Sequence, residues 1–457
     1  MRISLMHRAW AATSGTLVVA GAALLATGCS LRHELVAPQT PGVIDEGAAS
    51  GPTSANGLRI GALGALKLQT GSGETLWHLG GLLADEWKSS SSASATNEID
   101  QRSVSTNNPA LTNAYNGIQQ ARGYFVDAIT AMRTYRPYDP AWRGELFLGL
   151  AFLDLQMAED LCNGIPLGST VDGSPNYSAP LTNAAVFAEA LTNLDSALAL
   201  TTGTDSASVR VRPAALVARA RVLVDMGKFS DAAALVSSTA VTTAYQYVLT
   251  FSTASGLNGN FNLNNTVRAY TLGDSTDAAG RTANAMPFGS VNDPRVPRTV
   301  TTSKGVDGST TVVTQGQWTS TTAQIPLLSG IDARLVEAEA KLSANDIAGM
   351  MTILNALRTT QQTLGTFRPT TQAALATPSS QAAAIALFFR EKAFWTFGRG
   401  QRLGDLRRMI RQYNGASSAF PTGAFFKGGS YGTDVNLPVP DAERANPNFA
   451  GCLDRNA

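Results

Sequence analysis

Cysteine and histidine are both scarce in this chain of 457 residues, with three of each. Structural and catalytic metal centres depend on these residue types, and no His-Glu-x-x-His motif or cysteine cluster is present. The Gly-x-Ser-x-Gly turn of hydrolases and the glycine-rich phosphate loop with its lysine are missing as well. The sequence therefore predicts no metal and no cofactor.

An excess of one charge is also lacking, because 35 basic side chains nearly balance 34 acidic ones and leave a net charge of +1. Basic patches interleaved with aromatic residues, which nucleic-acid binders use, are not found. Beyond the N-terminus no apolar run reaches the roughly 20 residues that a membrane-spanning helix needs. We expect a soluble body that binds no nucleic acid.

The N-terminus has the features of an export signal. Arg2, His7 and Arg8 precede a short apolar stretch from 16 to 26, and small residues lead from there to Cys29. The cysteine makes the segment similar to a lipoprotein signal, whose cysteine is acylated and becomes the first mature residue. An ordinary signal peptide with an incidental cysteine is the alternative.

On the lipoprotein interpretation, residues 1–28 are a signal peptide and Cys29 carries the lipid. Residues 29–56 are rich in Pro, Gly, Ala and Ser, as expected of a tether, and 57–457 form the body. Each buried lipid methylene contributes about 0.8 kcal/mol, so stable anchoring takes more than one chain. We expect the membrane to be contacted only through this anchor.

Two further cysteines, Cys162 and Cys452, remain in the body. Cysteines of exported proteins meet an oxidising compartment and can pair, although free buried thiols are the alternative. We predict a disulfide that ties the C-terminal tail to the turn before Gly164.

Helical periodicity runs through most of the body. Tyr115, Ile118, Ala121 and Phe125 fall three or four residues apart and form one apolar stripe. Further helical stretches are predicted at 143–161, 213–240, 327–342, 346–358 and 381–413.

The stretch 213–240 reads as a helix-turn-helix hairpin. Pro213 suits the first position of a helix, and Gly227 permits the left-handed backbone that ends one. The unit resembles a tetratricopeptide repeat, which spans about 34 residues. The pairs 111–132 with 143–161 and 327–342 with 346–358 are similar, so degenerate helical repeats are predicted.

Two stretches lack helical periodicity. A polar loop is expected from Ser89 to about Asn108, after Trp87. Between 245 and 325, Gly, Asn, Thr and Ser dominate, with short alternating runs such as 310–313, and we expect no helix there. A stretch of this length without periodicity is often functional.

Seven short blocks occur in order along the body. They are Leu83–Trp87, Leu153–Leu155 with Gly164–Leu167, the hairpin at 213–240, Asn292–Arg295, Asp332–Ala340, Glu391–Lys392 with Gly400–Arg408, and Leu437–Pro440 with Asn446–Asn448. In these blocks the chain resembles the RagB/SusD family of outer-membrane nutrient-binding lipoproteins. Arg399 and Trp395 stand where the family usually has acidic residues. Arg402 and Asp405 lie three apart, as an ion pair on a helix requires.

The resemblance implies a mainly α fold. Tetratricopeptide-like helices at about 111–240 and 327–413 would form a scaffold, and irregular and β-hairpin insertions at about 245–325 the ligand face. It further implies a place on the outer leaflet of the outer membrane. There the protein would bind an oligosaccharide, or in some members a peptide, and deliver it to a SusC-like TonB-dependent transporter.

Sugar-binding sites combine aromatic faces with a few polar groups in a concave surface. The aromatic residues in or beside irregular segments are Trp87, Phe261, Tyr270, Phe288, Trp318, Phe425, Phe426 and Tyr431. Trp87 and Trp318 each stand beside a loop rich in Ser and Thr, so they are the candidates for ligand binding. Packing in the core is the alternative for either ring.

Two other functions are considered. A lipid-anchored scaffold would bind only protein through its helical repeats. A glycoside hydrolase would need two carboxylates that flank one bond. Glu337 and Glu339 lie two apart on a helix and diverge, and Asp85 and Glu86 suit local capping or pairing. We therefore expect no enzyme.

Overall fold

Pro52 begins the first helix, α2 (Pro52–Leu68), because its ring fixes φ near the helical value and a first turn does not need its N–H. The helix thus begins before position 57, where the sequence suggested that the body starts. The structure is a computed structural model that describes residues 50–171, 174–274, 282–283, 285–415 and 419–457. The predicted signal peptide, Cys29 and most of the tether lie outside these residues.

The unit Gly51–Ala457 is mainly α-helical, as predicted. Its α-helices are α2, α3 (Leu76–Ala84), α4 (Ser94–Asp100), α5 (Pro109–Tyr135), α6 (Pro140–Asp160), α7 (Asn183–Leu200), α8 (Ser206–Asp225), α9 (Phe229–Leu235), α10 (Gly259–Phe261), α11 (Gly330–Ser343), α12 (Ile347–Thr359), α13 (Gln381–Thr396) and α14 (Arg402–Gln412). A π-helix, η1 (Asn262–Thr266), and a 3-10 helix, η3 (Asp441–Ala445), complete them. None of the helices in the described ranges is long and apolar enough to cross a membrane.

The strands are short and form antiparallel pairs. They are β1 (Trp87–Ser89) with β7 (Tyr270–Leu272), β2 (Ile165–Pro166) with β5 (Pro180–Leu181), β3 (Ser169–Val171) with β4 (Ser174–Asn176), β6 (Gln246–Leu249) with β11 (Ile325–Ser329), β8 (Thr282–Ala283) with β12 (Thr422–Gly423), and β9 (Arg298–Lys304) with β10 (Thr311–Gln315). Two of these pairs, β1 with β7 and β8 with β12, join the 245–325 segment to distant parts of the chain.

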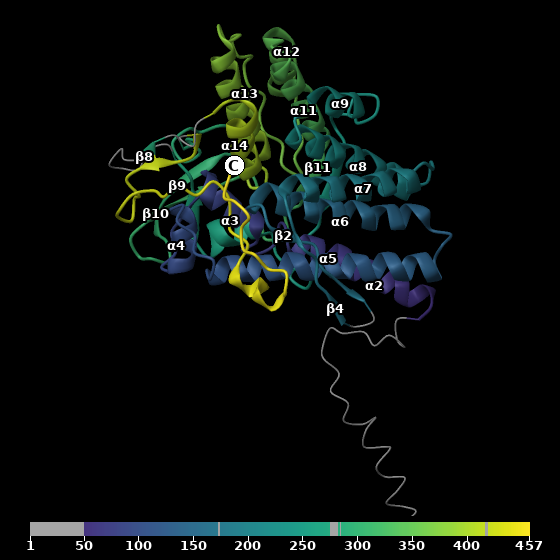
Figure 1. Ribbon diagram of the computed structural model, residues 1–457. Helices are drawn as coiled ribbons and strands as arrows, with labels where there is room; N and C mark the ends of the chain where they lie inside the picture. The colour runs from purple at the N-terminus through teal and green to yellow at the C-terminus, as the bar shows by residue number, and fades with distance from the viewer. Residues whose placement is uncertain (1–49, 172–173, 275–281, 284, 416–418) are drawn as a thin grey trace, which may run out of the picture. The chain divides into compact units, whose positions relative to one another are not determined.

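Neighbouring helices pack in pairs, which gives the tetratricopeptide-like arrangement. Helices α5, α6, α7 and α8 lie side by side in Figure 1, and α11 packs against α12 and α9. The predicted stripe of α5 is buried, with Tyr115, Ile118 and Phe125 at most 1% exposed. Burial of such stripes, rather than intrinsic helix propensity, supplies most of the stability of helices like these.

The start of α8 differs from the expectation at Pro213. The Asp205 side chain accepts hydrogen bonds from the backbone N–H groups of Ala207 and Ser208, so the helix begins at Ser206. Pro213 therefore lies inside the helix, where it removes one backbone hydrogen bond. The buried positions around it, Val211 and Ala214, offset that loss.

The predicted helix 381–413 is divided into α13 and α14. Gly398 and Gly400 have φ values of 64° and 65°, a left-handed backbone that ends α13 and that glycine adopts without strain. A Cβ on Gly400 would overlap the buried ring of Trp77, so the chain also needs glycine there for close approach.

Short helices lie in both stretches expected to lack them: α4 falls within 89–108, and α10 and η1 within 245–325. Asparagine side chains stabilise the second region. Asn258 accepts from the N–H of Phe261, and Asn264 donates to the carbonyl oxygen of Tyr270 at 2.9 Å. Such side-chain hydrogen bonds stabilise short helices that lack the apolar periodicity of longer ones, so periodicity does not predict these helices.

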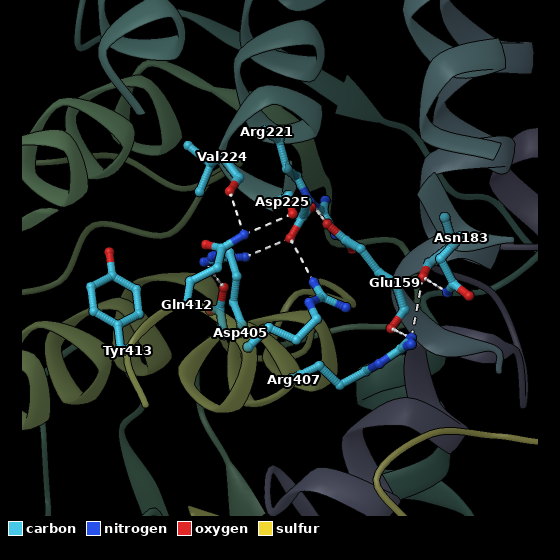
Figure 2. Close-up of polar contacts among 12 residues, drawn as sticks. Glu159, Asn183, Arg221, Val224, Asp225, Asp405, Arg407, Gln412 and Tyr413 are labelled. Atoms are coloured by element: carbon cyan, nitrogen blue, oxygen red, sulfur yellow. Dashed lines mark hydrogen bonds and ion pairs between the residues drawn. The ribbon is translucent and has the colours of Figure 1, made fainter. Parts of the chain in front are cut away.

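Buried arginines join α6, α8 and α14 (Figure 2). Arg221 Nε donates to Glu159 Oε1 at 2.6 Å. Arg407 donates to the carbonyl oxygens of Ala158, Glu159 and Leu161, which end α6 and lack partners within it. The Arg407 guanidinium thus donates hydrogen bonds to the carbonyl groups at the carboxyl end of α6, and its positive charge interacts favourably with the negative end of the helix dipole.

Arg402 and Asp405 do not form the ion pair that their spacing suggested. Arg402 pairs with Asp85, and Asp405 pairs with Lys392 at 2.7 Å and with Arg408 at 2.6 Å. Two cations already contact Asp405, so the side chain of Arg402 extends to the end of α3 instead.

Arg399, which stands where the family usually has an acid, also forms a buried ion pair. Its guanidinium donates to both carboxylate oxygens of Asp332, at 2.9 and 2.6 Å, and to the carbonyl oxygen of Pro326 at 2.8 Å. This residue therefore links the loop after α13 to the first turn of α11 and to β11.

A disulfide joins Cys162 to Cys452 in the structure. The residues beside the two cysteines form a further bond, from the N–H of Leu453 to the carbonyl oxygen of Asn163 at 2.8 Å. Gly164 has a φ of 119°, and a Cβ there would overlap a main-chain oxygen of the tail. The tail thus lies tightly against the turn that follows α6.

Candidate ligand-binding site

A cavity of about 700 Å³ lies where the irregular segments meet. Its lining comes from three parts of the chain, 88–97, 271–313 and 426–427, and more than half of it belongs to the 245–325 segment. The phenylalanine in its lining is Phe426, and we name it the Phe426 cavity.

Strand pairing places Lys88 in this lining. Lys88 of β1 is paired with Thr271 of β7, and both line the cavity. Side chains alternate across a strand, so the neighbouring Trp87 points the other way and is only 1% exposed.

Lys427 connects three walls of the Phe426 cavity. Its Nζ donates to the carbonyl oxygen of Ser91 at 2.6 Å and to Asn97 Oδ1 at 3.0 Å, and it pairs with Asp307 Oδ2 at 2.9 Å. The C-terminal segment is therefore fixed to the 89–97 region and to the β9–β10 turn at one ammonium group.

Asp307 also holds its own turn. Its carboxylate accepts from the backbone N–H groups of Ser309 and Thr310 and from the Thr310 hydroxyl at 2.6 Å. Burial alone would raise the pKa of Asp307, but the bonds from Thr310 and Lys427 outweigh burial and hold the pKa well below its usual value. The carboxylate is therefore ionised throughout the neutral range.

The ring of Phe426 supplies an apolar surface. Its centroid lies 4.8 Å from that of Phe425, which is 2% exposed and supports it edge-on. The ammonium groups of Lys88 and Lys427 lie 5.5 and 5.7 Å from its centroid. An apolar ring beside the polar side chains of the lining suits a ligand that carries C–H and hydroxyl groups on one ring.

Asp100 is a titratable group close to these lysines. It is 2% exposed and accepts from the N–H of Ser89 at 2.6 Å. Burial raises the pKa of Asp100 to about 7, against the opposing effects of the Ser89 bond and the charges of Lys88 and Lys427.

Burial corrects the expectation for Trp87 and Trp318. Each is 1% exposed, and their rings lie 4.8 and 6.1 Å from the buried ring of Phe397. Gln315 Oε1 accepts from the backbone N–H of Trp318 at 2.8 Å, which fixes the backbone that carries the second ring. Both tryptophans are core residues, and neither lines the Phe426 cavity.

The residues that do line it carried little signal in the sequence. Phe426 is one of eight aromatic residues noted in or beside irregular segments, and nothing in the sequence separates it from the others. Lys88, Asn97, Asp307 and Lys427 are ordinary polar residues whose approach depends on pairing between distant segments.

None of the four carboxylates considered for hydrolysis lines this cavity. Asp85 pairs with Arg402, Glu337 with Arg334 and Glu339 with Arg408, while Glu86 is fully buried. Within the described ranges, no group of three or more His, Cys, Asp or Glu residues is placed to hold a metal ion.

No family model and no curated protein matches this sequence. Solved structures do match. A SusD superfamily protein from Bacteroides fragilis has a TM-score of 0.62 at 14% identity, over 88% of this chain and 99% of that one. A SusD-like carbohydrate binding protein from Bacteroides vulgatus has a TM-score of 0.60 at 13% identity, over 88% and 98%.

A SusD/RagB family protein from Bacteroides thetaiotaomicron matches in the same way, with a TM-score of 0.58 at 13% identity, over 86% of this chain and 95% of that one. Similarity over nearly the whole length of each chain, at such low identity, establishes a shared fold. The fold that the resemblance to the RagB/SusD family implied is thereby confirmed, and the chain has the SusD-like fold.

Proposed function

We propose that this chain is a lipid-anchored protein of the outer membrane that binds an oligosaccharide in the Phe426 cavity and delivers it to a TonB-dependent transporter. The observation that carries the proposal is the cavity itself. It joins an apolar ring to hydroxyl, amide and charged groups, in the segment that the family resemblance implies as the ligand face.

The chemistry of the lining favours a neutral saccharide. Lys88 and Lys427 are balanced by Asp274 and Asp307, so the cavity carries no excess of either sign. Ser, Thr and Asn side chains supply further donors and acceptors for hydroxyl groups. The volume lies within the range of about 300–1,000 Å³ that small-molecule sites occupy.

Calorimetric titration of the mature chain with a panel of neutral oligosaccharides tests the binding step. Phe426→Ala should lower the affinity for the bound glycan at least about tenfold, roughly 1.4 kcal/mol, because the apolar face is lost. Tyr138 is 64% exposed and lies outside the cavity, so Tyr138→Ala is the matched control and should bind like wild type. Equal affinity of the Phe426 variant and wild type would contradict the site.

The anchor is tested separately. Cys29→Ala should release the body from the membrane without unfolding it, because no helix in the described residues could hold it there. A variant that remains membrane-bound at high salt would contradict lipidation at Cys29.

Delivery is tested by affinity purification of the lipidated chain from its own outer membrane. A TonB-dependent barrel should copurify with it. Tight binding to such a barrel, without binding of any glycan or peptide, would favour the scaffold function. Hydrolysis of a glycan by the pure protein would overturn both functions.

A further inference from the structure

A second cavity, of about 360 Å³, lies beside α5 and shares no lining residue with the Phe426 cavity. Its walls are α5, the turn and hairpin formed by 166–169 and 176–177, and η3 near the C-terminus. Both η3 and β3 contact α5, and β4 is paired with β3. We name it the Tyr124 cavity.

Exposed aromatic residues gather in this cavity. Four aromatic side chains are exposed in the described part of the chain, all of them tyrosines: Tyr124, Tyr135, Tyr138 and Tyr177. Tyr124 and Tyr177, at 40% and 44% exposure, both line the cavity although they come from different elements. Half of the exposed aromatic rings in the described residues thus converge on one concave surface, which marks it as a candidate interaction site.

The helix α5 forms one side of the cavity. Gln120, Gly123, Tyr124 and Asp127 are spaced three or four residues apart, so they share the face opposite the buried stripe. A Cβ built on Gly123 would meet nothing within 4 Å, so this part of the wall is open space rather than packed protein.

The polar side of the cavity is fixed by hydrogen bonds. The Tyr115 hydroxyl donates to Glu443 Oε1 at 2.9 Å and accepts from Gln119 Nε2 at 3.0 Å. The same nitrogen donates to the carbonyl oxygen of Pro166 at 2.8 Å. On the other side, Asn446 is 4% exposed and donates to the carbonyl oxygen of Ser178, next to Tyr177.

Charge separates this cavity from the first. Among the residues that line it, the charged ones are Asp127 and Glu443, and none is basic. Carboxylate and amide oxygens accept hydrogen bonds from hydroxyl and ammonium groups, but they repel carboxylates and sulfates. A ligand that stacks on tyrosine and donates hydrogen bonds fits this surface, and an acidic ligand does not.

We propose that the Tyr124 cavity is a second saccharide-binding site that takes neutral or amino sugars and rejects uronic acids. Its volume lies at the small end of the range for ligand sites, which suits a short stretch of glycan rather than a long chain. A weak second contact of this kind raises the overall affinity for a polymer that spans both sites.

The test uses the mature chain with Phe426→Ala, so that the first cavity does not dominate the signal. Saturation-transfer NMR is run with neutral hexasaccharides, a glucosamine hexamer and a galacturonic acid hexamer. At least one neutral or amino-sugar oligomer should bind. Adding the two substitutions Tyr124→Ala and Tyr177→Ala together should lower the affinity for that oligomer at least tenfold. The acidic hexamer should bind at least tenfold more weakly.

Two further variants separate binding from folding. Tyr135→Ala alters the same residue type on the same helix, at 38% exposure but outside the cavity, and should bind within twofold of the parent. Gly123→Leu fills the open space and has the higher helix propensity, so the midpoint of thermal unfolding should stay or rise while binding is lost.

Unchanged binding in both the tyrosine and the Gly123 variants would overturn the second site. So would an acidic oligomer that binds as tightly as the neutral ones. The absence of a tyrosine-dependent signal from every oligomer would also overturn it. The first site has its own readout, the difference between wild type and Phe426→Ala, so the two proposals fail independently.

Discussion

Arg402 and Asp85 form a two-pronged ion pair across 317 residues of sequence, with Nε–Oδ1 and Nη2–Oδ2 distances of 2.8 Å. Both side chains are buried, and Asp85 Oδ2 also accepts from the N–H of Met286 at 2.9 Å. One carboxylate thus holds the end of α3, the start of α14 and the irregular segment together.

Asp85→Asn should therefore destabilise the protein strongly. The variant leaves the Arg402 guanidinium buried without its counter-charge, which typically costs about 3–5 kcal/mol. Urea unfolding of the mature chain measures the change. Asp441→Asn is the control, because Asp441 pairs with Arg444 on the surface, where a pair contributes about 0–1 kcal/mol. Similar losses in both variants would contradict the role of Asp85.

The sequence blocks that carry the family resemblance supply these buried contacts. Asp85, Asp332 and Arg402 all lie in such blocks, and all form ion pairs in the core. The helices were predictable because apolar stripes are local features of the sequence, and the ordered blocks indicated the fold. Neither showed which distant residue each buried charge contacts. The expected Arg402–Asp405 pair was wrong because spacing alone does not show competing partners.

The candidate site was much less predictable. Lys88 and Lys427 approach each other only because β1 pairs with β7 and the C-terminal segment returns to them, and neither event leaves a local pattern. Tyr124 lies off the apolar stripe of α5, so its exposure follows from periodicity, but its approach to Tyr177 does not. The position of Trp87 beside a polar loop wrongly suggested ligand binding. Side chains alternate between the two faces of β1, and the side chain of Trp87 lies on the face that packs in the core.

Glu86 should make the stability depend on pH. Burial raises its pKa to about 8, against the opposing hydrogen bond from the N–H of Gly398. Because this pKa lies above that of the unfolded chain, the group's contribution to stability is complete at low pH and is lost as pH rises through about 8. Glu86→Gln cannot ionise, and its amide oxygen can still accept from Gly398.

The stability of wild type relative to Glu86→Gln should therefore fall by about 1.4 kcal/mol per pH unit between roughly pH 5 and 8. Urea unfolding at pH 5, 6, 7 and 8 measures this difference. Other buried acids with raised pKa values, such as Asp160, are present in both proteins and cancel. Parallel stability profiles of the two proteins would show that Glu86 has no such pKa.

Two glycines with nearly the same backbone separate conformational strain from steric overlap. Gly400 and Gly308 have φ values of 65° and 68°, but a Cβ on Gly400 would overlap Trp77 whereas one on Gly308 would meet nothing within 4 Å. Gly308→Ala should cost about 1–2 kcal/mol, the price of the left-handed backbone. Gly400→Ala should cost a further 1–3 kcal/mol or so for overpacking. Equal unfolding free energies for the two variants would contradict the close approach of Trp77.

The disulfide between Cys162 and Cys452 closes a separation of 290 residues, so it restricts the unfolded chain considerably. Wild type unfolded without reductant should show no reactive thiol in the mature, acylated chain, and two reactive thiols would contradict the bond.

Cys452→Ser should lower the free energy of unfolding by about 2–5 kcal/mol. The bond from Leu453 to Asn163 remains in the variant, so the tail should stay docked and the folded state intact. Reduced wild type is the matched control, since it loses the same bond without a substitution. The free energy of unfolding of reduced wild type should equal that of Cys452→Ser. If reduced and oxidised wild type were equally stable, the disulfide would add nothing and the tail would be held by its hydrogen bonds alone.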